Sequence, residues 1–549
     1  MNLMKETATV NPFIGLAYGP SMALVAQQHS DRLALVWGGR RFSFSEVKRE
    51  VDRASVAISR LGLVKGDKLA IWLPNRPEFI WNWLGAAQIG VIPVVLNTRL
   101  TTEEVAYQLE QSDSRAVVIP GDGAFRDFLG DLISICPEIQ QGRLDAGCAT
   151  RLPKLEYVLA LDAVADPPAG IDDWSSPRVE ETPLPPFETD PHAPGMIAYS
   201  SGTTALPKGV VLNQSAFRKA WDHGERFEQT PEDRLLLAVP LFGILANLNG
   251  ILTFWSRGSA VVLESRFEPG RALDLIESER CTAAYFLPSM VDRMLDHPEF
   301  RPERVTSIRT GVIATTDPAL TRQAVEALGM DDFITTYGMT ETSSVCMRTH
   351  CRDPLDVRLE THGTPLPDIE IRIGDIETGQ EVPPGTEGEI QVRGYNLLLG
   401  YYRKPTETAA AMTPDGFFRT GDLGVQRTDG RFKFMRRIRD GYKHKGFNVS
   451  TAEVEAAIAE HPNIASAAVL GIPDGANGEI GVAFVISRDG RTIEQQELLE
   501  TLRTRLASFK LPAHIFTVAE FARTSGTDRV QKFRLRELAL EKIAANTSP

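Results

Sequence analysis

One short stretch concentrates the side chains that bind phosphate. From Ser200 to Gly209 the chain carries four hydroxyl side chains, two glycines and one lysine within ten residues. Hydroxyls and backbone N–H groups donate to phosphate oxygens, glycines let the backbone come close, and Lys208 adds a mobile positive charge. The spacing is not that of a P-loop, because Lys208 precedes a glycine rather than Ser or Thr. The stretch indicates a polyphosphate-binding loop, with a polar surface turn as the alternative.

A second group of polar residues, Tyr337, Thr340 and Glu341, lies within a few positions of the chain. An aromatic ring can stack on an adenine, a threonine hydroxyl can donate to a phosphate, and Mg²⁺ prefers carboxylates together with phosphate oxygens. The alternative is an ordinary strand followed by a solvated loop.

The third feature is a basic strip at residues 431–446, with seven Lys or Arg side chains against one acid. The whole chain is acidic, with 59 Lys and Arg, 72 Asp and Glu and a net charge of -13. This balance argues against a general nucleic-acid or anionic-membrane binder. An anionic ligand therefore has to be met by a local patch such as this strip.

Alternating helices and strands are expected to position these residues. Ser43 and Glu46 form a capping-box pattern before a helical repeat that ends at Gly62. Strands are expected at 69–73, 91–96 and 116–119, with helices after Pro77 and after Thr101. Repeated βα units favour parallel sheets layered with helices, an α/β fold.

The length and composition set further bounds. A chain of 549 residues is too long for one compact core, so two or more domains are expected. Its five cysteines show no CxxC pair, which favours reduced thiols over zinc or disulfides. Neither a signal pattern nor an unbroken apolar span is evident, which predicts a cytoplasmic protein without membrane contact.

The loop at 199–209 closely resembles the phosphate loop of the adenylate-forming superfamily, which includes acyl-CoA synthetases, luciferases and peptide-synthetase adenylation domains. The family pattern usually has Gly where this chain has Ala205. The resemblance continues from about residue 30 to residue 538, with the motifs in the family's order. It implies a large N-terminal domain of several subdomains at 1–435 and a small mobile α+β domain at 436–549.

The resemblance also implies roles for individual residues. ATP or an acyl-AMP would be bound with Mg²⁺, Glu341 would bind the metal, Thr340 would contact the α-phosphate and Asp422 would accept the ribose hydroxyls. The nucleotide-binding residues implied are Ser200, Ser201, Gly202, Thr203, Thr204, Lys208, Tyr337, Thr340, Asp422 and Arg437.

An acyl pocket is implied at Phe242, Gly243, Gly311 and Gly338. A buried strand is expected at 235–241, and residues 309–314 resemble the acyl-pocket strand of the family. Where this chain has Gly243, the family often has histidine or a bulky aromatic. One interpretation is room for a large or rigid acyl group, and the other is a simple turn glycine.

The basic strip resembles the hinge before a C-terminal domain that rotates between an adenylating pose and a pose that admits the thiol of coenzyme A. Arg436 stands where the family has Asp or Lys. The coenzyme A contacts implied are Arg436, Lys443, Lys445, Gly446 and Phe447, with Lys443 also counted as catalytic.

The lysine of the family's last motif is missing. Counting back from Val530-Gln531-Lys532 puts Arg529 in the lysine position, and counting forward from Arg523-Thr524 puts Asp528 there. Losing one charge donor to a transition state typically costs about 10² to 10³ in rate. Arg529 keeps the charge in a larger, planar form, so we expect an impaired adenylation step.

Three functions remain open. The first is an acyl-CoA ligase that takes a preformed acyl-adenylate of a bulky carboxylic acid from a separate adenylating enzyme, as in the suspected resemblance to platensimycin-pathway ligases of antibiotic biosynthesis. The second is a complete ATP-dependent acyl-CoA synthetase for a fatty or aryl acid. The third is a non-catalytic acyl-nucleotide binding protein. A carrier-protein thiol as acceptor and a homodimer also remain open.

Overall fold

The structure is a computed structural model. It describes residues 10–121, 124–142, 144, 150–162, 164, 167–169, 171–174, 182–200, 207–315, 317–438, 441–444, 447–474, 478–488, 490, 493–503, 505–506, 508–523 and 530–547. Side-chain positions are described for these residues except 443, 447, 448, 509 and 545–547.

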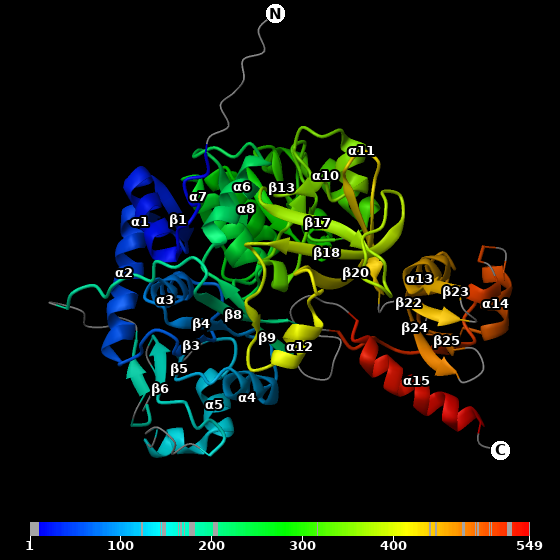
Figure 1. Ribbon diagram of the computed structural model, residues 1–549, viewed down its shortest axis with the longest axis horizontal. Coiled ribbons are helices and arrows are strands. Elements are labelled where there is room, and N and C mark those ends of the chain that lie inside the picture. The colour runs from blue at the N-terminus through cyan, green and yellow to red at the C-terminus, as the bar shows by residue number, and fades with distance from the viewer. Residues whose placement is uncertain are drawn as a thin grey trace, which may run out of the picture. The chain divides into compact units, whose positions relative to one another are not determined.

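The chain divides into two compact units. The first contains Met1–Ile371, Val392–Phe418 and Asp429–Lys433. The second contains Arg372–Gln391, Arg419–Thr428 and Phe434–Pro549. Helices and strands mix throughout, which confirms the predicted α/β class (Figure 1). The boundary predicted between residues 435 and 436 falls inside a strand and stays a prediction.

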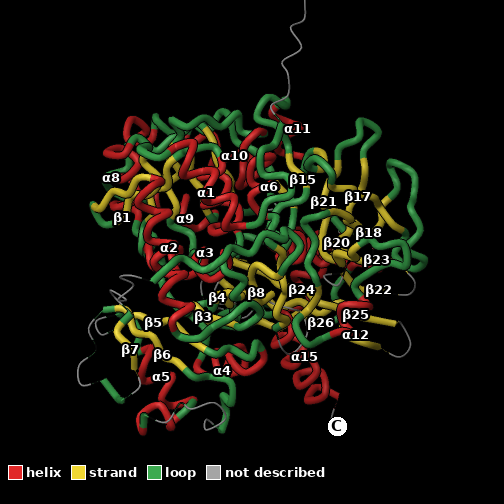
Figure 2. Tube along the Cα trace, turned by 60° about the vertical axis from the view of Figure 1, so that its left-hand side comes forward, coloured by secondary structure: helices red, strands yellow, loops and turns green. Residues whose placement is uncertain are grey.

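One large sheet of the first unit has an antiparallel edge and a parallel interior. Its order is β19 (Gly400–Tyr401), β9 (Lys208–Asn213), β8 (Pro194–Ser200), β4 (Ile92–Val95), β3 (Lys68–Ile71), β5 (Ala116–Pro120), β6 (Tyr157–Leu161) and β7 (Ile171–Asp173). The contacts β19–β9 and β9–β8 are antiparallel, and the others are parallel. Helix α3 packs on β3 and β4, and α2 packs on α3 (Figures 1 and 2).

A second sheet of this unit is parallel apart from its β1–β2 edge. Its order is β13 (Thr310–Ile313), β12 (Ala283–Phe286), β10 (Arg234–Leu237), β11 (Ala260–Leu263), β1 (Leu33–Trp37) and β2 (Arg40–Ser43). A small antiparallel sheet contains β14 (Thr336–Tyr337), β15 (Met347–Arg348) and β16 (Thr364–Pro365). Another sheet contains β17 (Ile369–Gly374), β18 (Glu387–Gly394), β20 (Phe418–Gln426) and β21 (Phe432–Arg437).

The C-terminal sheet belongs to the second unit. Its order is β23 (Phe447–Ser450), β22 (Gly441–His444), β25 (Gly478–Ser487) and β24 (Ile464–Asp474), and β26 (His514–Thr517) also pairs with β25. The helices of this unit are α13 (Thr451–Ala459), α14 (Gln495–Arg503), α15 (Lys532–Thr547) and the short η6 (Ser508–Lys510).

Most helices of the chain belong to the first unit. They are α1 (Tyr18–His29), α2 (Phe44–Arg60), α3 (Pro77–Gln88), α4 (Thr102–Gln111), α5 (Phe128–Ile135), α6 (Ala216–Glu225), α7 (Leu252–Ser256), α8 (Pro269–Glu279), α9 (Pro288–Leu295), α10 (Pro318–Leu328), α11 (Leu355–Glu360) and α12 (Pro405–Ala410). The shorter elements are η1 (Pro137–Gln141), η2 (Leu245–Ile251), η3 (Pro302–Val305) and η4 (Thr340–Thr342), of which η2 is a π-helix. No helix in the described ranges has both the length and the apolar character needed to cross a bilayer.

Local end signals are confirmed at the N-terminal helices. The Ser43 side chain accepts from the backbone N–H of Glu46 and the Glu46 carboxylate accepts from that of Ser43, so both bonds of the predicted capping box form before α2. Thr101 and Glu104 form the same arrangement before α4. These signals depend on four successive residues and need no tertiary context.

The strand predicted at 235–241 is shorter than expected, since β10 ends at Leu237. The Asn75 side chain takes the place of a neighbouring strand. Its amide donates to the Val239 carbonyl oxygen over 3.0 Å and accepts from the Leu241 N–H over 2.7 Å. The backbone at 238–241 therefore stays buried without extending the sheet.

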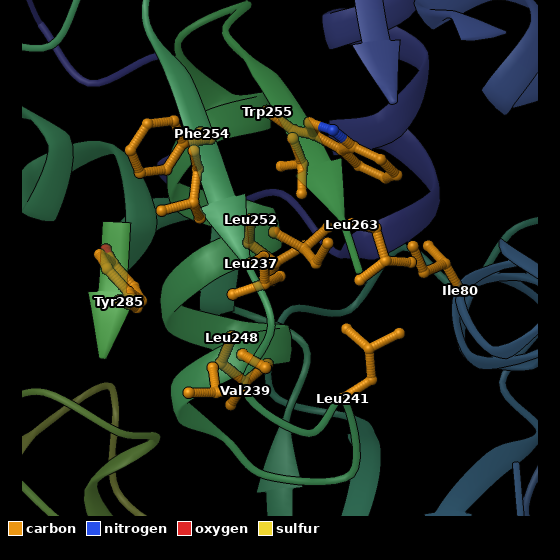
Figure 3. Packing of buried hydrophobic residues seen from close by; sticks show 14 of the residues in the cluster. Ile80, Leu237, Val239, Leu241, Leu248, Leu252, Phe254, Trp255, Leu263 and Tyr285 are labelled. Carbon is orange, nitrogen blue, oxygen red and sulfur yellow. The ribbon is translucent and has the colours of Figure 1, made fainter. Parts of the chain in front are cut away.

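A continuous apolar core joins the π-helix to the strands on either side of it. Figure 3 shows Tyr285 on β12 at one edge of this group and Ile80 of α3 at the other, with Leu248 and Leu252 between them. The core holds η2 against the second sheet and so fixes the segment that follows Phe242 and Gly243.

Candidate active site

The predicted phosphate loop is the connection of an antiparallel hairpin. Ser200 ends β8 and pairs with Lys208, the first residue of β9. The Tyr107 hydroxyl of α4 donates to the Pro207 carbonyl oxygen over 2.9 Å, and the Tyr199 hydroxyl donates to the Gln108 carbonyl oxygen over 2.9 Å. Two tyrosines therefore anchor the stem of the hairpin to α4. The predicted phosphate ligands Ser201, Gly202, Thr203 and Thr204 lie outside the described residues.

Lys208 and Glu341 both contact Tyr401, Lys208 at the ring and Glu341 at the hydroxyl. The Lys208 ammonium nitrogen lies 4.6 Å from the centre of the Tyr401 ring. The Tyr401 hydroxyl donates to Glu341 Oε1 over 3.1 Å, and Glu341 is only 9% exposed. Burial, followed by the charge of Glu341, raises the pKa of Tyr401 above its usual value, so Tyr401 remains the donor.

A tight turn presents Thr340 and Glu341. Both lie in the 3-10 turn η4, and the two residues that follow it, Ser343 and Ser344, have φ angles of 52° and 86°. Left-handed conformations are strained in non-glycine residues and persist only where the surroundings impose them. A Cβ atom at Gly338 would lie 1.9 Å from the Ser344 carbonyl oxygen, so the return of the chain requires glycine there.

The Tyr337 ring, expected to stack on an adenine, is nearly buried and meets the His362 ring edge-on at 6.0 Å between centres. Burial lowers the pKa of His362 to about 4. This histidine is therefore neutral at pH 7 and packs as an aromatic ring.

The two glycines predicted for the acyl pocket differ in their surroundings. A Cβ atom at Gly311 on β13 would lie 2.0 Å from the Ala284 carbonyl oxygen, so this position excludes any side chain. At Gly243 the nearest atom would be the Pro240 carbonyl oxygen at 3.3 Å, and the φ angle is not positive. The backbone conformation at 243 therefore suits a side chain, but a new Cβ atom would be in tight contact with the Pro240 carbonyl oxygen, which would have to shift by a few tenths of an ångström. Phe242 beside it is partly buried against the core.

Asp422 and Arg437, both in the second unit, lie together. Asp422 on β20 is buried, and its Oδ1 atom lies 3.5 Å from Nε of Arg437 at the end of β21. The Thr420 hydroxyl donates to the Ile390 carbonyl oxygen over 2.6 Å and accepts from the Asp422 N–H over 3.1 Å. This fixes the backbone that carries the carboxylate. Arg436 donates to the Arg437 carbonyl oxygen over 3.2 Å.

The segment predicted to meet coenzyme A forms a hairpin in the second unit. Lys443 on β22 pairs with Asn448, and His444 pairs with Phe447 on β23. Lys445 and Gly446, which connect these strands in sequence, are outside the described residues, as are Asp528 and Arg529.

One further group of potential metal ligands contains Glu228, His350 and Cys351, whose ligand atoms lie within 4.8 Å of one another. The Glu228 carboxylate already pairs with Arg352, whose backbone N–H donates to His350 Nδ1 over 3.1 Å. Burial raises the pKa of Cys351 to about 11, so its thiol is protonated at pH 7. Glu228 and His350 are therefore already engaged by Arg352, through an ion pair and a hydrogen bond. Four cysteines of the described chain are free and buried.

Sequence reasoning missed Tyr401 and a buried group of polar residues on α6, η2, β12 and β15. Tyr401 lies in the sequence Gly400-Tyr401-Tyr402, and nothing in its neighbours points to Glu341, which is 60 residues away. A signal did exist for α6, because Lys219 and His223 fall on the same helical face as the buried Ala216 and Ala220.

Comparisons with known proteins agree with this arrangement. The chain matches the AMP-binding enzyme family over residues 23–402 and the AMP-binding enzyme C-terminal domain over 453–526. It is 29% identical to the putative acyl-CoA synthetase YngI of Bacillus subtilis over 96% of this chain and 98% of that protein. It is 30% identical to the human mitochondrial medium-chain acyl-CoA ligase ACSF2 over 94% of this chain and 87% of that protein.

Solved structures give the same result. ATP-bound MatB from Rhodopseudomonas palustris superimposes with a TM-score of 0.81 at 25% identity, covering 95% of this chain and 99% of that chain. The o-succinylbenzoate CoA synthetase MenE of Bacillus subtilis, in complex with its acyl-adenylate intermediate, gives a TM-score of 0.76 at 26% identity over 94% of this chain and 97% of that chain.

This chain belongs to the AMP-binding enzyme family, that is, to the adenylate-forming superfamily. Within it, the relatives place the chain in the acyl-CoA ligase branch.

The two glycines of the predicted acyl pocket give a matched test. We expect Gly311→Ala to lower the free energy of unfolding by about 3 kcal/mol, because a backbone oxygen occupies the site of the new methyl group. Gly243→Ala should change it by less than about 1 kcal/mol, because the backbone conformation suits alanine while the new methyl group only touches the Pro240 carbonyl oxygen. Thermal unfolding of both variants beside wild type measures the difference. Equal losses of unfolding free energy in the two variants would contradict the claim that a side chain is excluded at 311 but not at 243.

Proposed function

We propose that this protein joins a bulky carboxylic acid to the thiol of coenzyme A through an acyl-adenylate. The observation that carries the proposal is the contact series from Lys208 through Tyr401 to Glu341. It brings the stem of a phosphate-type loop next to a buried carboxylate, the pair of groups that a magnesium nucleotide requires. The ATP and acyl-adenylate present in the similar MatB and MenE structures support this assignment.

The residues have distinct roles in this proposal. Lys208 and the loop at 200–204 hold the phosphates, Tyr337 contacts the adenine, and Thr340 donates to the α-phosphate. The Tyr401 hydroxyl orients the Glu341 carboxylate, whose oxygens suit Mg²⁺. Bound there, Mg²⁺ would offset the negative charge of the phosphates.

The second unit supplies the remaining groups. Asp422 accepts the ribose hydroxyls, and Arg437 beside it contacts the nucleotide. Residues 436–549 form the C-terminal domain that changes pose between the two half-reactions. Arg436 and the hairpin at 443–447, with Lys443 at its start, then meet coenzyme A, whose phosphates suit the basic strip.

In this proposal the adenylation step is impaired. Arg529 or Asp528 stands where the family's lysine bridges the acid and the α-phosphate. Arginine keeps the charge but is bulkier than an ammonium group, and a neighbouring aspartate opposes it. The favoured substrate is therefore an acyl-adenylate made by a separate enzyme. A complete ATP-dependent synthetase is the second candidate, favoured by the matches to both family domains.

The first test is pyrophosphate release from ATP without coenzyme A, over aryl, fatty and polycyclic acids. We expect little release by wild type and at least about 10²-fold more by Arg529→Lys, because lysine restores the compact charge donor. Arg534→Lys on α15 is the matched control and should change nothing. Synthetic acyl-adenylates with coenzyme A should give thioester with both variants and with wild type.

The outcomes separate the candidates. Strong release by wild type would leave a complete synthetase in which Arg529 serves as the donor. Absence of thioester from every acyl-adenylate would contradict the proposed ligase and leave a binding protein.

The Tyr401 contact has its own test. We expect Tyr401→Phe to lower the adenylation rate at least about 10-fold and to raise the Mg²⁺ concentration for half-maximal rate, because Glu341 loses the donor that orients it. The rate is measured in wild type, or in the Arg529→Lys background if wild type is silent. Tyr402→Phe is the control, since its hydroxyl contacts Asp113 over 2.9 Å instead. Equal effects of the two changes would contradict the role of Tyr401.

The space at Gly243 predicts substrate size. We expect Gly243→Phe to lower kcat/KM for polycyclic acyl-adenylates at least about 10-fold while small linear ones change little, because the ring would fill the pocket entrance. Gly243→Ala serves as the mild control. Unchanged selectivity in the phenylalanine variant would remove the bulky-acid part of the proposal.

A further inference from the structure

A group of cationic and polar side chains is buried in the first unit. Lys219 and His223 lie one turn apart on α6, Asn249 lies on η2, Tyr285 on β12 and Arg348 on β15. All five are buried. The elements α6, η2 and β12 carry no residue to which the proposed function gives a catalytic role. Figure 3 shows Tyr285 at the edge of the apolar core beside the π-helix.

Hydrogen bonds and close polar contacts connect most members of this buried group. Arg348 Nη1 donates to the His223 carbonyl oxygen over 2.7 Å. The Tyr285 hydroxyl lies 3.4 Å from His223 Nε2 and donates to the Asn249 carbonyl oxygen over 3.2 Å. Lys219 Nζ donates to the Ser343 carbonyl oxygen over 2.6 Å. These bonds join Arg348, His223, Tyr285 and Asn249. Lys219 lies one turn before His223 on α6, and we refer to the five residues together as one cluster.

The charge of this cluster is not balanced. Within the described part of the chain, neither Lys219 nor Arg348 forms an ion pair. No carboxylate is among the neighbouring groups whose charge shifts the pKa of Lys219 or of Arg348. Burial, and then Arg348, lowers the pKa of Lys219 to about 7. A buried cation without an anionic partner is strongly unfavourable unless a ligand or water compensates it.

Several polar atoms of the cluster also lack hydrogen bonds. Among the described residues, no partner lies within reach of Arg348 Nε and Nη2, His223 Nδ1, or either side-chain amide atom of Asn249. Buried polar groups in proteins are almost always paired. Two free guanidinium donors on one side of Arg348 match the two oxygens of a carboxylate.

The cluster adjoins each segment of the predicted acyl pocket. Asn249 lies on η2, whose first turn donates two hydrogen bonds to the Gly243 carbonyl oxygen, from the N–H groups of Ala246 over 2.9 Å and Asn247 over 3.2 Å. Tyr285 pairs with Val312, next to Gly311. Arg348 pairs with Thr336 on the strand that ends in Tyr337. π-Helical turns such as η2 are frequent at functional sites.

We infer that the acid accepted by this protein carries a second carboxylate at the end remote from the reacting carboxyl, held by Arg348 and Lys219 with Asn249 and His223 beside them. This inference rests on the proposed ligase function and specifies its substrate class as dicarboxylic acids or their half-adenylates. The bound carboxylate supplies the missing counter-charge and the missing acceptors.

The test compares acids that differ only at the remote end: octanoic with octanedioic acid, and 4-methylbenzoic with benzene-1,4-dicarboxylic acid. Each is supplied with ATP and as a synthetic mono-adenylate, so that a slow adenylation step does not hide the preference. We expect kcat/KM for the diacid member to exceed that of its partner at least about 10-fold, the typical effect of a charged hydrogen-bonded contact.

Arg348→Met and Lys219→Met should both abolish this preference, while Arg322→Met, which removes an exposed arginine of α10, should keep it. Lys219 also holds the Ser343 carbonyl, so the ratio between paired acids, rather than the rate, is the readout. If Arg348→Met does not fold, Lys219→Met decides the result.

A second measurement does not depend on turnover. Diacids should raise the thermal unfolding temperature of wild type by a few degrees, whereas matched monoacids and the two methionine variants should show no such shift. Equal use of the paired acids, preference for the monoacid, or equal stabilisation by monoacids and diacids would overturn the inference. If no acyl-adenylate gives thioester, the proposed function fails, and the unfolding temperatures alone then decide the inference.

Discussion

The hydrogen bond from the Tyr401 hydroxyl to the Glu341 carboxylate is the contact on which the site depends. It joins the antiparallel edge of the large sheet to the turn at 340–342. A buried carboxylate needs hydrogen-bond donors, and Tyr401 provides one to Glu341 while its ring lies under Lys208. One residue thus fixes the spacing between a cation and an anion that come from distant parts of the chain.

Neighbouring hydrogen bonds fix the conformation of the turn that carries Glu341. The left-handed residues Ser343 and Ser344 store local strain directly after the turn at 340–342. Three contacts offset that strain: Lys219 donates to the Ser343 carbonyl oxygen, the Asn396 amide donates to that of Thr342 over 2.9 Å, and the Ser343 hydroxyl donates to that of Asn396 over 2.8 Å. The buried cation of α6 therefore contributes to the geometry of the turn as well as to the cluster around Arg348.

The sequence predicted what depends on neighbouring residues and missed what depends on distant ones. The capping box at Ser43 and Glu46 and the strand at 116–119 follow from local patterns, and both are confirmed. The end of β10 depends on Asn75, more than 150 residues earlier, so no local pattern contains it. The order of the motifs identified the family, but the roles of Tyr401 and Arg348 follow from contacts that only folding creates.

The contrast between the two pocket glycines has an evolutionary consequence. At position 311 the backbone itself forbids a side chain, so glycine there reflects the fold and is expected in any relative with this strand arrangement. At position 243 the backbone conformation allows a side chain, and a new Cβ atom would meet only the Pro240 carbonyl oxygen at 3.3 Å. If Gly243 lines the acyl pocket as proposed, variation at 243 among relatives would follow the acids they use, whereas glycine at 311 would follow from the fold alone.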